Sequence, residues 1–175
     1  MRKVTKFDIP ALVTLHKKAA TTPNGIARNP EEINEKTVSD FVKRSLENGL
    51  CFVIENPANP QELISEIHCF KHDPSAFKHT MGNLTLVVHP DFQGRGFGKK
   101  IFSYLLSEIK NNHPSIRRIE LSVRDNNPGA MRLYKSLGFE IEGVMRDRIL
   151  DAEGRLSGDI MMALLLERAL YTHST

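Results

Sequence analysis

The stretch that decides the fold runs from Leu84 to Ile109 and reads LTLVVHPDFQGRGFGKKIFSYLLSEI. Its first five residues alternate in the manner of a strand, and the His-Pro-Asp at 89–91 interrupts that pattern. From Phe97 onward, apolar residues recur at helical spacing, and glycines at 94, 96 and 98 lie between the two patterns. A glycine-rich turn of this kind presents unpaired backbone N–H groups at the positive end of a helix dipole. The stretch therefore predicts an anion site, and a phosphate is the anion that such sites most often bind.

Two common phosphate-binding motifs do not fit this loop. The dinucleotide fingerprint Gly-x-Gly-x-x-Gly, started at Gly94, would place its third glycine where Lys99 stands. The P-loop ends in Gly-Lys-Ser/Thr, whereas Gly98 is followed by two lysines. A nucleotide-binding domain of either kind is therefore disfavoured. The structural alternative is a tight strand-to-helix turn that binds nothing.

Length and composition indicate a single globular domain spanning residues 1–175, with 40% hydrophobic and 26% charged residues. The net charge of +3 comes without a basic block, which argues against a nucleic-acid partner. No apolar run approaches the roughly 20 residues of a membrane span, and the N-terminus does not read as a signal peptide. A cytoplasmic protein is expected. Cys51 and Cys69 lack metal-binding spacing and are expected to be buried reduced thiols.

The rest of the chain predicts an alternation of helices and strands around this stretch. Helices are expected after Asp8, from a cap at Asn29 to about Leu46, and over 128–137. Strands are expected at 2–6, 51–54, 63–70, 84–88, 118–123, from 139, and at 159–166. Residues 163–170 can also be read as helix. The strand, helix and strand from 84 to 123 form a parallel crossover unit.

A second motif occupies residues 127–139, which read NPGAMRLYKSLGF. It fits Asn-x-x-Ala-x-x-Leu/Val-Tyr-x-x-x-Gly-Phe, and residues 93–98 fit Gln/Arg-x-x-Gly-x-Gly/Ala. Two such blocks, separated by one helix and one strand, resemble the signature motifs of the GNAT N-acetyltransferase family. The close match covers about residues 84 to 146, and the N-terminal half follows the family only in the order of its elements.

The resemblance implies an α/β fold of the α+β mixed kind, with a strongly twisted sheet of six or seven strands flanked by about four helices. The strands 84–88 and 118–123 would splay apart, and the pantetheine arm of acetyl-CoA would lie between them. The backbone of Leu86, Val87 and Val88 would pair with that arm, and the Val88 N–H would polarise the thioester carbonyl. The other residues expected to hold the cofactor are Gln93, Gly94, Arg95, Gly96, Phe97, Gly98, Lys99, Asn127 and Tyr134. A solvated helix face is the alternative for Lys99 and Lys100, and a helix cap alone is the alternative for Asn127.

Direct attack of an amine on the thioester requires a base, donors for the oxyanion and an acid for the departing sulfur. Tyr134 matches the family's general acid, and a phenol is protonated at pH 7; an ordinary core tyrosine is the alternative. Many members carry a glutamate as base on the strand before the glycine loop, but residues 81–83 are Met, Gly and Asn. Glu66, His68 and His79 are the remaining candidates for the base, directly or through water. A base is dispensable if the amine arrives partly neutral.

The sequence thus predicts an acetyl-CoA-dependent N-acetyltransferase that acts on a primary amine of a small molecule such as an amino acid, or on a protein N-terminus. No metal, nucleic acid or membrane is expected as a partner, and a homodimer is left open. A regulatory module that binds acetyl-CoA or CoA without turnover is the alternative, because the expected glutamate is missing. Acceptor specificity is expected in the first two helices and the loops, where no motif is evident.

Overall fold

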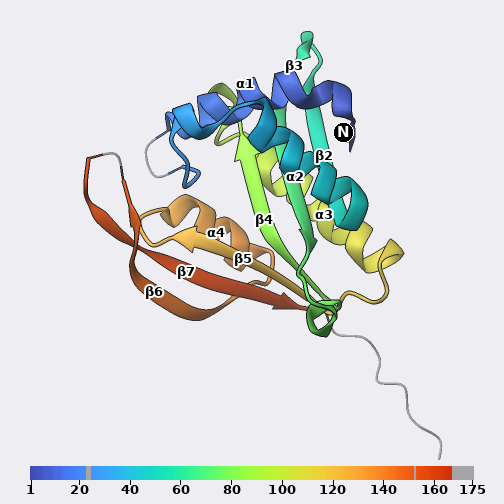
Figure 1. The fold of residues 1–175 in the computed structure, drawn as a ribbon, viewed down its shortest axis with the longest axis vertical. Helices are drawn as coiled ribbons and strands as arrows, with labels where there is room; N and C mark the ends of the chain where they lie inside the picture. The colour runs from blue at the N-terminus through green and yellow to red at the C-terminus, as the bar shows by residue number, and fades with distance from the viewer. Residues whose placement is uncertain (23–24, 152, 167–175) are drawn as a thin grey trace, which may run out of the picture.

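One mixed β-sheet forms the centre of the computed structural model, which describes residues 1–22, 25–151 and 153–166 (Figure 1). Within these ranges the sheet has seven strands in the order β1-β2-β3-β4-β5-β7-β6. The strands are β1 (Arg2–Lys3), β2 (Gly49–Asn56), β3 (Asn59–Lys71), β4 (Thr80–Val88), β5 (Arg118–Arg124), β6 (Glu140–Leu150) and β7 (Leu156–Leu165). β4 and β5 pair in parallel, and the other neighbouring strands of the described sheet pair antiparallel. The predicted mixed sheet of six or seven strands is confirmed.

Four α-helices of the described chain cover the two faces of the sheet. They are α1 (Ile9–Ala20), α2 (Glu35–Asn48), α3 (Phe97–Asn112) and α4 (Pro128–Ser136). Strand β2 shows why two layers form, since its side chains alternate between the faces. Leu50, Phe52 and Ile54 enter the core beneath α3 and α4, whereas Cys51 and Val53 enter the core beneath α1 and α2. Both cysteines are buried and free, as predicted.

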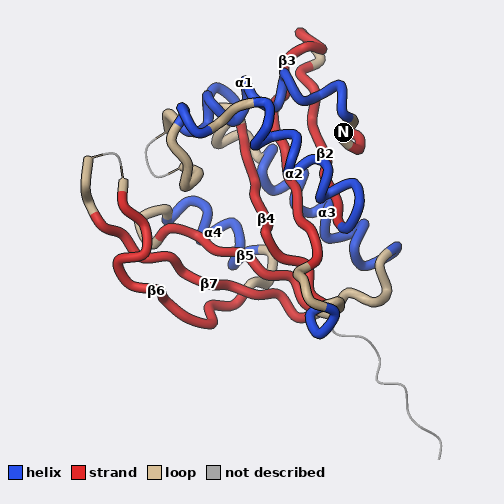
Figure 2. Tube along the Cα trace, in the orientation of Figure 1, coloured by secondary structure: helices blue, strands red, loops and turns tan. Residues whose placement is uncertain are grey.

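The two central strands separate soon after they meet. β4 and β5 pair only through Thr80 with Arg118 and Met81 with Ile119. Figure 2 shows the strands diverging from this end, so that the rest of β4 has a neighbour on one side only, β3. The predicted splay of the central strands is thus present, and it leaves a gap that opens toward the glycine loop.

The second helix begins later than predicted. Asn29 starts a short 3-10 turn over Pro30–Glu32, and the chain at Ile33 then becomes extended, with φ −93° and ψ 110°. Ile33 is fully buried, which explains the interruption, because an uninterrupted helix would carry this side chain elsewhere. The cap is Asn34, whose side chain accepts a hydrogen bond from the Thr37 N–H at 3.0 Å. The first predicted strand is likewise shorter, ending at Lys3.

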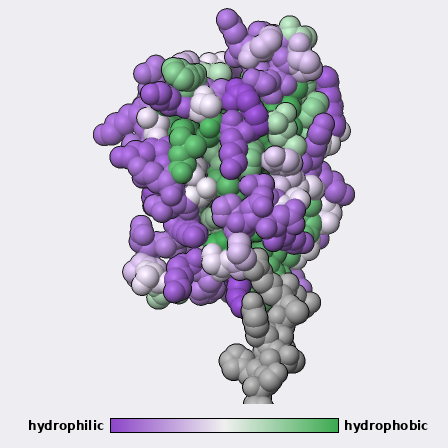
Figure 3. Space-filling model, turned by 90° about the vertical axis from the view of Figure 1, so that its right-hand side faces the viewer, coloured by the Kyte–Doolittle hydropathy of each residue, from purple (hydrophilic) through white to green (hydrophobic). Residues whose placement is uncertain are grey.

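The last strand is a strand as far as Leu165, which settles the ambiguity for the described part of 163–170. Residues 167–170 lie outside the described residues. Among the helices of the described chain, none combines the length and apolar character needed to cross a membrane. Figure 3, which views the right-hand side of Figure 1, shows mostly hydrophilic side chains with small hydrophobic areas between them.

Candidate active site

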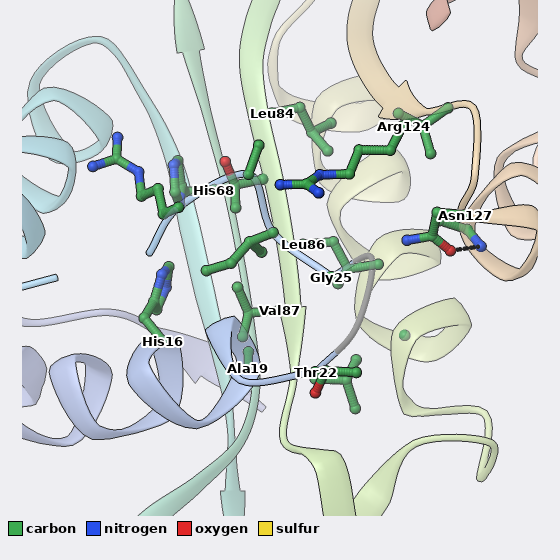
Figure 4. A pocket seen from close by; sticks show the side chains of 18 of the residues that line it. His16, Ala19, Thr22, Gly25, His68, Leu84, Leu86, Val87, Arg124 and Asn127 are labelled. Carbon is green, nitrogen blue, oxygen red and sulfur yellow. Dashed lines mark hydrogen bonds between the residues drawn. The ribbon is translucent and has the colours of Figure 1, made fainter. Parts of the chain in front are cut away.

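A cleft of about 1270 Å³ lies where β4 and β5 separate (Figure 4). This volume exceeds the roughly 300–1,000 Å³ typical of a pocket for one small ligand, so the cleft has room for two. One half, which we call the cofactor half, is lined by β4, the glycine loop (residues 93–98) and the start of α4. The other, the acceptor half, is lined by α1, α2, the loop between them, and residues of β3, β5, β6 and β7.

The open edge of β4 turns backbone groups away from β3 at alternate residues. The His89 N–H donates to the Ile64 carbonyl at 2.8 Å, and in this register Glu66 faces Val87 and His68 faces Thr85. Because residues in an antiparallel pair alternate in the direction of their N–H and C=O groups, Val87 points to β3 while Leu86 and Val88 point into the gap. Two of the three predicted backbone contacts therefore fit. The predicted contact through the backbone of Val87 does not fit, because that backbone faces β3.

The glycine loop joins β4 to α3 with its amides exposed. Gly94 and Gly96 have φ angles of 72° and 82°, a left-handed conformation that other residues adopt only at a cost. The first helical bond of α3 runs from the Lys100 N–H to the Gly96 carbonyl at 3.0 Å, which leaves the amides of residues 97–99 without an acceptor in the helix. Gln93 ties the loop to β4 by donating to the Val88 carbonyl at 3.2 Å. The loop is thus built to bind an anion.

Three cationic side chains in and after this loop are exposed to solvent. Arg95, Lys99 and Lys100 are all exposed, and Arg95 lies over the Phe92 ring at 5.2 Å. Lys99 lines the cleft, whereas Lys100 does not.

Helix α4 brings two predicted residues to the cofactor half. The Asn127 side chain caps the helix by accepting from the Ala130 N–H at 3.0 Å, the bond drawn in Figure 4. Tyr134 is buried against Phe102 and Phe139 and also lines the cleft. Burial raises the pKa of Tyr134 to about 12, because a phenolate would lose its solvation. The side chain therefore carries its proton at neutral pH.

A buried carboxylate organises the acceptor half. Glu66 is fully buried on β3, and its two oxygens lie 3.0 Å from His16 Nε2 and 2.9 Å from His68 Nδ1. The Cys51 thiol donates to the same carboxylate at 3.2 Å. We call these four residues the Glu66 cluster. Phe41 stacks on His68 with ring centres 4.1 Å apart, so α2 closes over the cluster.

The charges of the Glu66 cluster follow from these contacts. Burial alone would raise the pKa of Glu66, but His68 and His16 outweigh it and lower the pKa to about 2. Glu66 is therefore an anion at neutral pH, and burial beside it raises the pKa of Cys51 well above its usual value. Because His68 uses Nδ1 to bind Glu66, its Nε2 is the nitrogen left to accept a proton. His16 and His68 line the cleft, whereas Glu66 lies behind them.

Among the three candidate bases, the structure brings His68 to the cleft and holds Glu66 directly behind it, outside the lining. It does not bring His79, which is exposed and precedes β4, with its carbonyl accepting from the Arg117 N–H at 2.8 Å. No sequence pattern indicated His16, Phe41, Arg44 or Arg124 as lining residues. Their elements are far apart in the chain, and no local pattern links them.

Comparison with known proteins agrees with this geometry. The model of the Acetyltransferase (GNAT) family matches residues 12–139. The chain belongs to the GNAT family. The matched range includes the glycine loop, the second motif at residues 127–139 and all four residues of the Glu66 cluster. The GNAT family uses acetyl-CoA as its cosubstrate.

Curated relatives of this GNAT protein match over shorter ranges. A [ribosomal protein bS18]-alanine N-acetyltransferase of Salmonella typhimurium is 34% identical over 76 residues, which cover 43% of this chain and 50% of that protein. The L-amino acid N-acyltransferase MnaT of Escherichia coli is 35% identical over 71 residues, which cover 39% of this chain and 38% of that protein. The chain thus spans half or less of the length of these relatives.

Solved structures match over the whole fold. An acetyltransferase from Salmonella typhimurium with its cofactor acetyl-CoA has a TM-score of 0.83 at 20% identity, covering 99% of this chain and 97% of that one. A phosphinothricin acetyltransferase from Sinorhizobium meliloti in complex with acetyl-CoA has a TM-score of 0.80 at 18% identity, covering 99% and 91%. At these identities, the likeness is one of fold.

Proposed function

We propose that this protein is an acetyl-CoA-dependent N-acetyltransferase that transfers acetyl to a primary amine by direct attack in a ternary complex. The observation that carries the proposal is the open edge of β4, because Leu86 and Val88 direct backbone groups into a gap that starts at an anion-binding loop. A pantetheine arm carries amides that can pair with such an edge, as an added strand would. Its pyrophosphate then meets the amides of residues 97–99 at the N-terminus of α3.

The cofactor half would activate the thioester in two ways. The N–H of Val88 would donate to the thioester carbonyl and stabilise the oxyanion that forms when the amine attacks. Tyr134 would give its hydroxyl proton to the sulfur as the carbon–sulfur bond breaks. Burial keeps the phenol protonated at neutral pH, so Tyr134 holds a proton that it can give to the thiolate as the thiolate forms.

The acceptor half would prepare the amine. An ammonium must lose a proton before its nitrogen can attack, and His68 Nε2 would take that proton directly or through a water. Glu66 would fix the ring by accepting from Nδ1, and it would stabilise the imidazolium that forms. The Glu66 cluster thus supplies what the missing glutamate on β4 would have supplied.

The acceptor class is an amine of a small molecule such as an amino acid, or a protein N-terminus. Support comes from the relatives, which are named for an L-amino acid acceptor and for the alanine of a ribosomal protein. No nucleic acid is proposed as a partner. A cytoplasmic location fits an enzyme that consumes acetyl-CoA, and a homodimer remains a prediction.

A thiol-release assay with acetyl-CoA tests the proposal. Purified protein is incubated with a panel of amino acids, short peptides with free N-termini, and polyamines, and acetyl-CoA binding is measured separately by calorimetry. We expect binding together with amine-dependent thiol release for at least one class of acceptor. Binding without release from any acceptor would favour the non-catalytic module, and the absence of binding would reject both.

A further inference from the structure

One arginine in the acceptor half has no hydrogen-bond or ion-pair partner within the part of the chain that the structure describes. Arg124 is half-buried at the end of β5, and its Nε is shielded from solvent without a hydrogen-bond partner among residues 1–22, 25–151 and 153–166. Among the described residues its guanidinium makes neither a hydrogen bond nor an ion pair. A shielded guanidinium nitrogen without an acceptor destabilises the fold, because it has lost its hydrogen bonds to water and no protein group replaces them.

The other arginines that line the cleft are accounted for. Arg148 lies 3.7 Å from the carboxylate of Asp159, and Arg44 lies over the Phe70 ring at 4.3 Å. Arg28 is exposed to water. Asp159 stands opposite Arg124 across the β5–β7 pair, yet its carboxylate lies against Arg148.

The side chain of Arg124 points into the acceptor half. Alternation along β5 sends Leu121 and Val123 into the core beneath α3 and α4, so Arg124 and Ser122 lie on the opposite face of the sheet. That face also carries the Glu66 cluster. Figure 4 shows Arg124 reaching from β5 across the gap toward Leu84 and His68, and away from Asn127 on the cofactor side.

We infer that Arg124 binds a carboxylate of the acceptor, so that the amine substrate is a free α-amino acid. This inference rests on the proposed function and narrows its acceptor class. A guanidinium forms paired, charge-assisted hydrogen bonds with a carboxylate. In an α-amino acid the amine and the carboxylate share one carbon, so a carboxylate held by Arg124 keeps the amine beside β4 and His68.

The same chemistry disfavours the other acceptor classes. A peptide N-terminus presents a neutral amide carbonyl where the amino acid has its carboxylate, and one carbonyl oxygen satisfies the guanidinium less well. A polyamine brings positive charge toward Arg124, and like charges repel strongly in a shielded site. Arg124 thereby selects for a negative charge close to the reacting amine.

The test compares each standard amino acid that has a primary amine with its α-carboxamide, in the wild type and in Arg124→Met. The amide removes the negative charge and keeps the side chain and the amine. The ratio of kcat/KM for acid over amide is taken within each variant, so that the different basicity of the two amines cancels between variants. Arg117→Met is the matched control, because Arg117 is exposed, precedes β5 and does not line the cleft.

We expect the wild type and Arg117→Met to prefer the acid of at least one pair. In Arg124→Met, kcat/KM for that acid should fall about tenfold or more, mainly through KM, since one charge-assisted interaction is worth more than 1.4 kcal/mol. The value for the amide should stay within about twofold, as should the KM for acetyl-CoA. Arg124→Lys should recover part of the loss, because it keeps the charge without the paired geometry.

The folding of Arg124→Met is checked by its melting temperature, which should equal or exceed that of the wild type because an unpartnered group has been removed. An equal fall for acid and amide, or no change for either, overturns the inference. So does a wild type that acetylates peptides or polyamines but no free amino acid, although the proposed function then stands. Release of no thiol with any amine overturns both.

Discussion

The two halves of the cleft are built in different ways. The cofactor half presents mainly backbone groups, from the open edge of β4 and from the glycine loop. The acceptor half presents side chains, which converge from α1, α2, β3 and β5. A binding surface made of backbone groups depends on local conformation, so glycines and helix caps within a short stretch of sequence predict it. A binding surface made of side chains depends on tertiary contacts between distant residues, so the sequence predicts it only weakly.

This difference explains what could be predicted. Gly94 and Gly96 indicated the loop because their φ angles require glycine, and Asn127 indicated α4 because it caps the helix. By contrast, His16 and Glu66 are 50 residues apart, and the sequence around either residue does not predict their contact. A charged residue inside the apolar strand β3 was the one available signal. The late start of α2 was missed because Asn29 and Asn34 both resemble caps, and only the burial of Ile33 distinguishes them.

The largest expected effect comes from removing the carboxylate that holds the acceptor half together. Glu66→Ala leaves two imidazoles and a thiol without their shared acceptor, so the free energy of unfolding should fall by about 3–5 kcal/mol in urea titrations at pH 7. Glu62→Ala is the control on the same strand, because Glu62 forms a surface ion pair with Lys18 at 3.4 Å, and it should cost at most about 1 kcal/mol. Equal losses in the two variants would contradict a structural role for the Glu66 cluster.

The stability difference between the wild type and Glu66→Ala should depend on pH. The pKa of Glu66 is lowered to about 2 in the folded protein from a usual value of 4.5, so the unfolded chain binds the proton more readily. The stability that Glu66 contributes is therefore complete above about pH 5 and declines as the pH falls toward 2. The difference in unfolding free energy between the wild type and Glu66→Ala should narrow over that range. A constant difference would mean that Glu66 is not ionised in the fold.

Tyr134→Phe should break the chemistry of the cofactor half while sparing its binding. Loss of the proton for the departing sulfur should lower kcat about 100-fold, within the usual range for general acid catalysis. The Kd for acetyl-CoA should stay within about threefold, because the ring remains packed against Phe102 and Phe139. Phe102→Leu, which alters the packing and leaves the hydroxyl, is the control. Unchanged turnover in Tyr134→Phe, measured where chemistry limits the rate, would remove Tyr134 as the acid.

A smaller effect should follow when the glycine loop alone is strained. A Cβ at Gly96 has open space around it but must adopt a φ of 82°, which costs roughly 1–2 kcal/mol. Gly96→Ala should therefore weaken acetyl-CoA binding by about tenfold in calorimetry, with little change in the KM of the amine. Gly143→Ala also meets open space and has no positive φ, so its binding should match the wild type. A rise in the KM of the amine without weaker acetyl-CoA binding would contradict the assignment of the glycine loop to the cofactor half.

The central claim is that the open edge of β4 holds the cofactor through its backbone, and amide hydrogen exchange with and without acetyl-CoA tests it most directly. Acetyl-CoA should slow exchange at Leu86 and Val88, whose N–H groups face the gap, and leave Val87 nearly unchanged because it is already paired with β3. Saturating acetyl-CoA that protects the glycine loop but leaves Leu86 and Val88 exchanging as before would contradict the account.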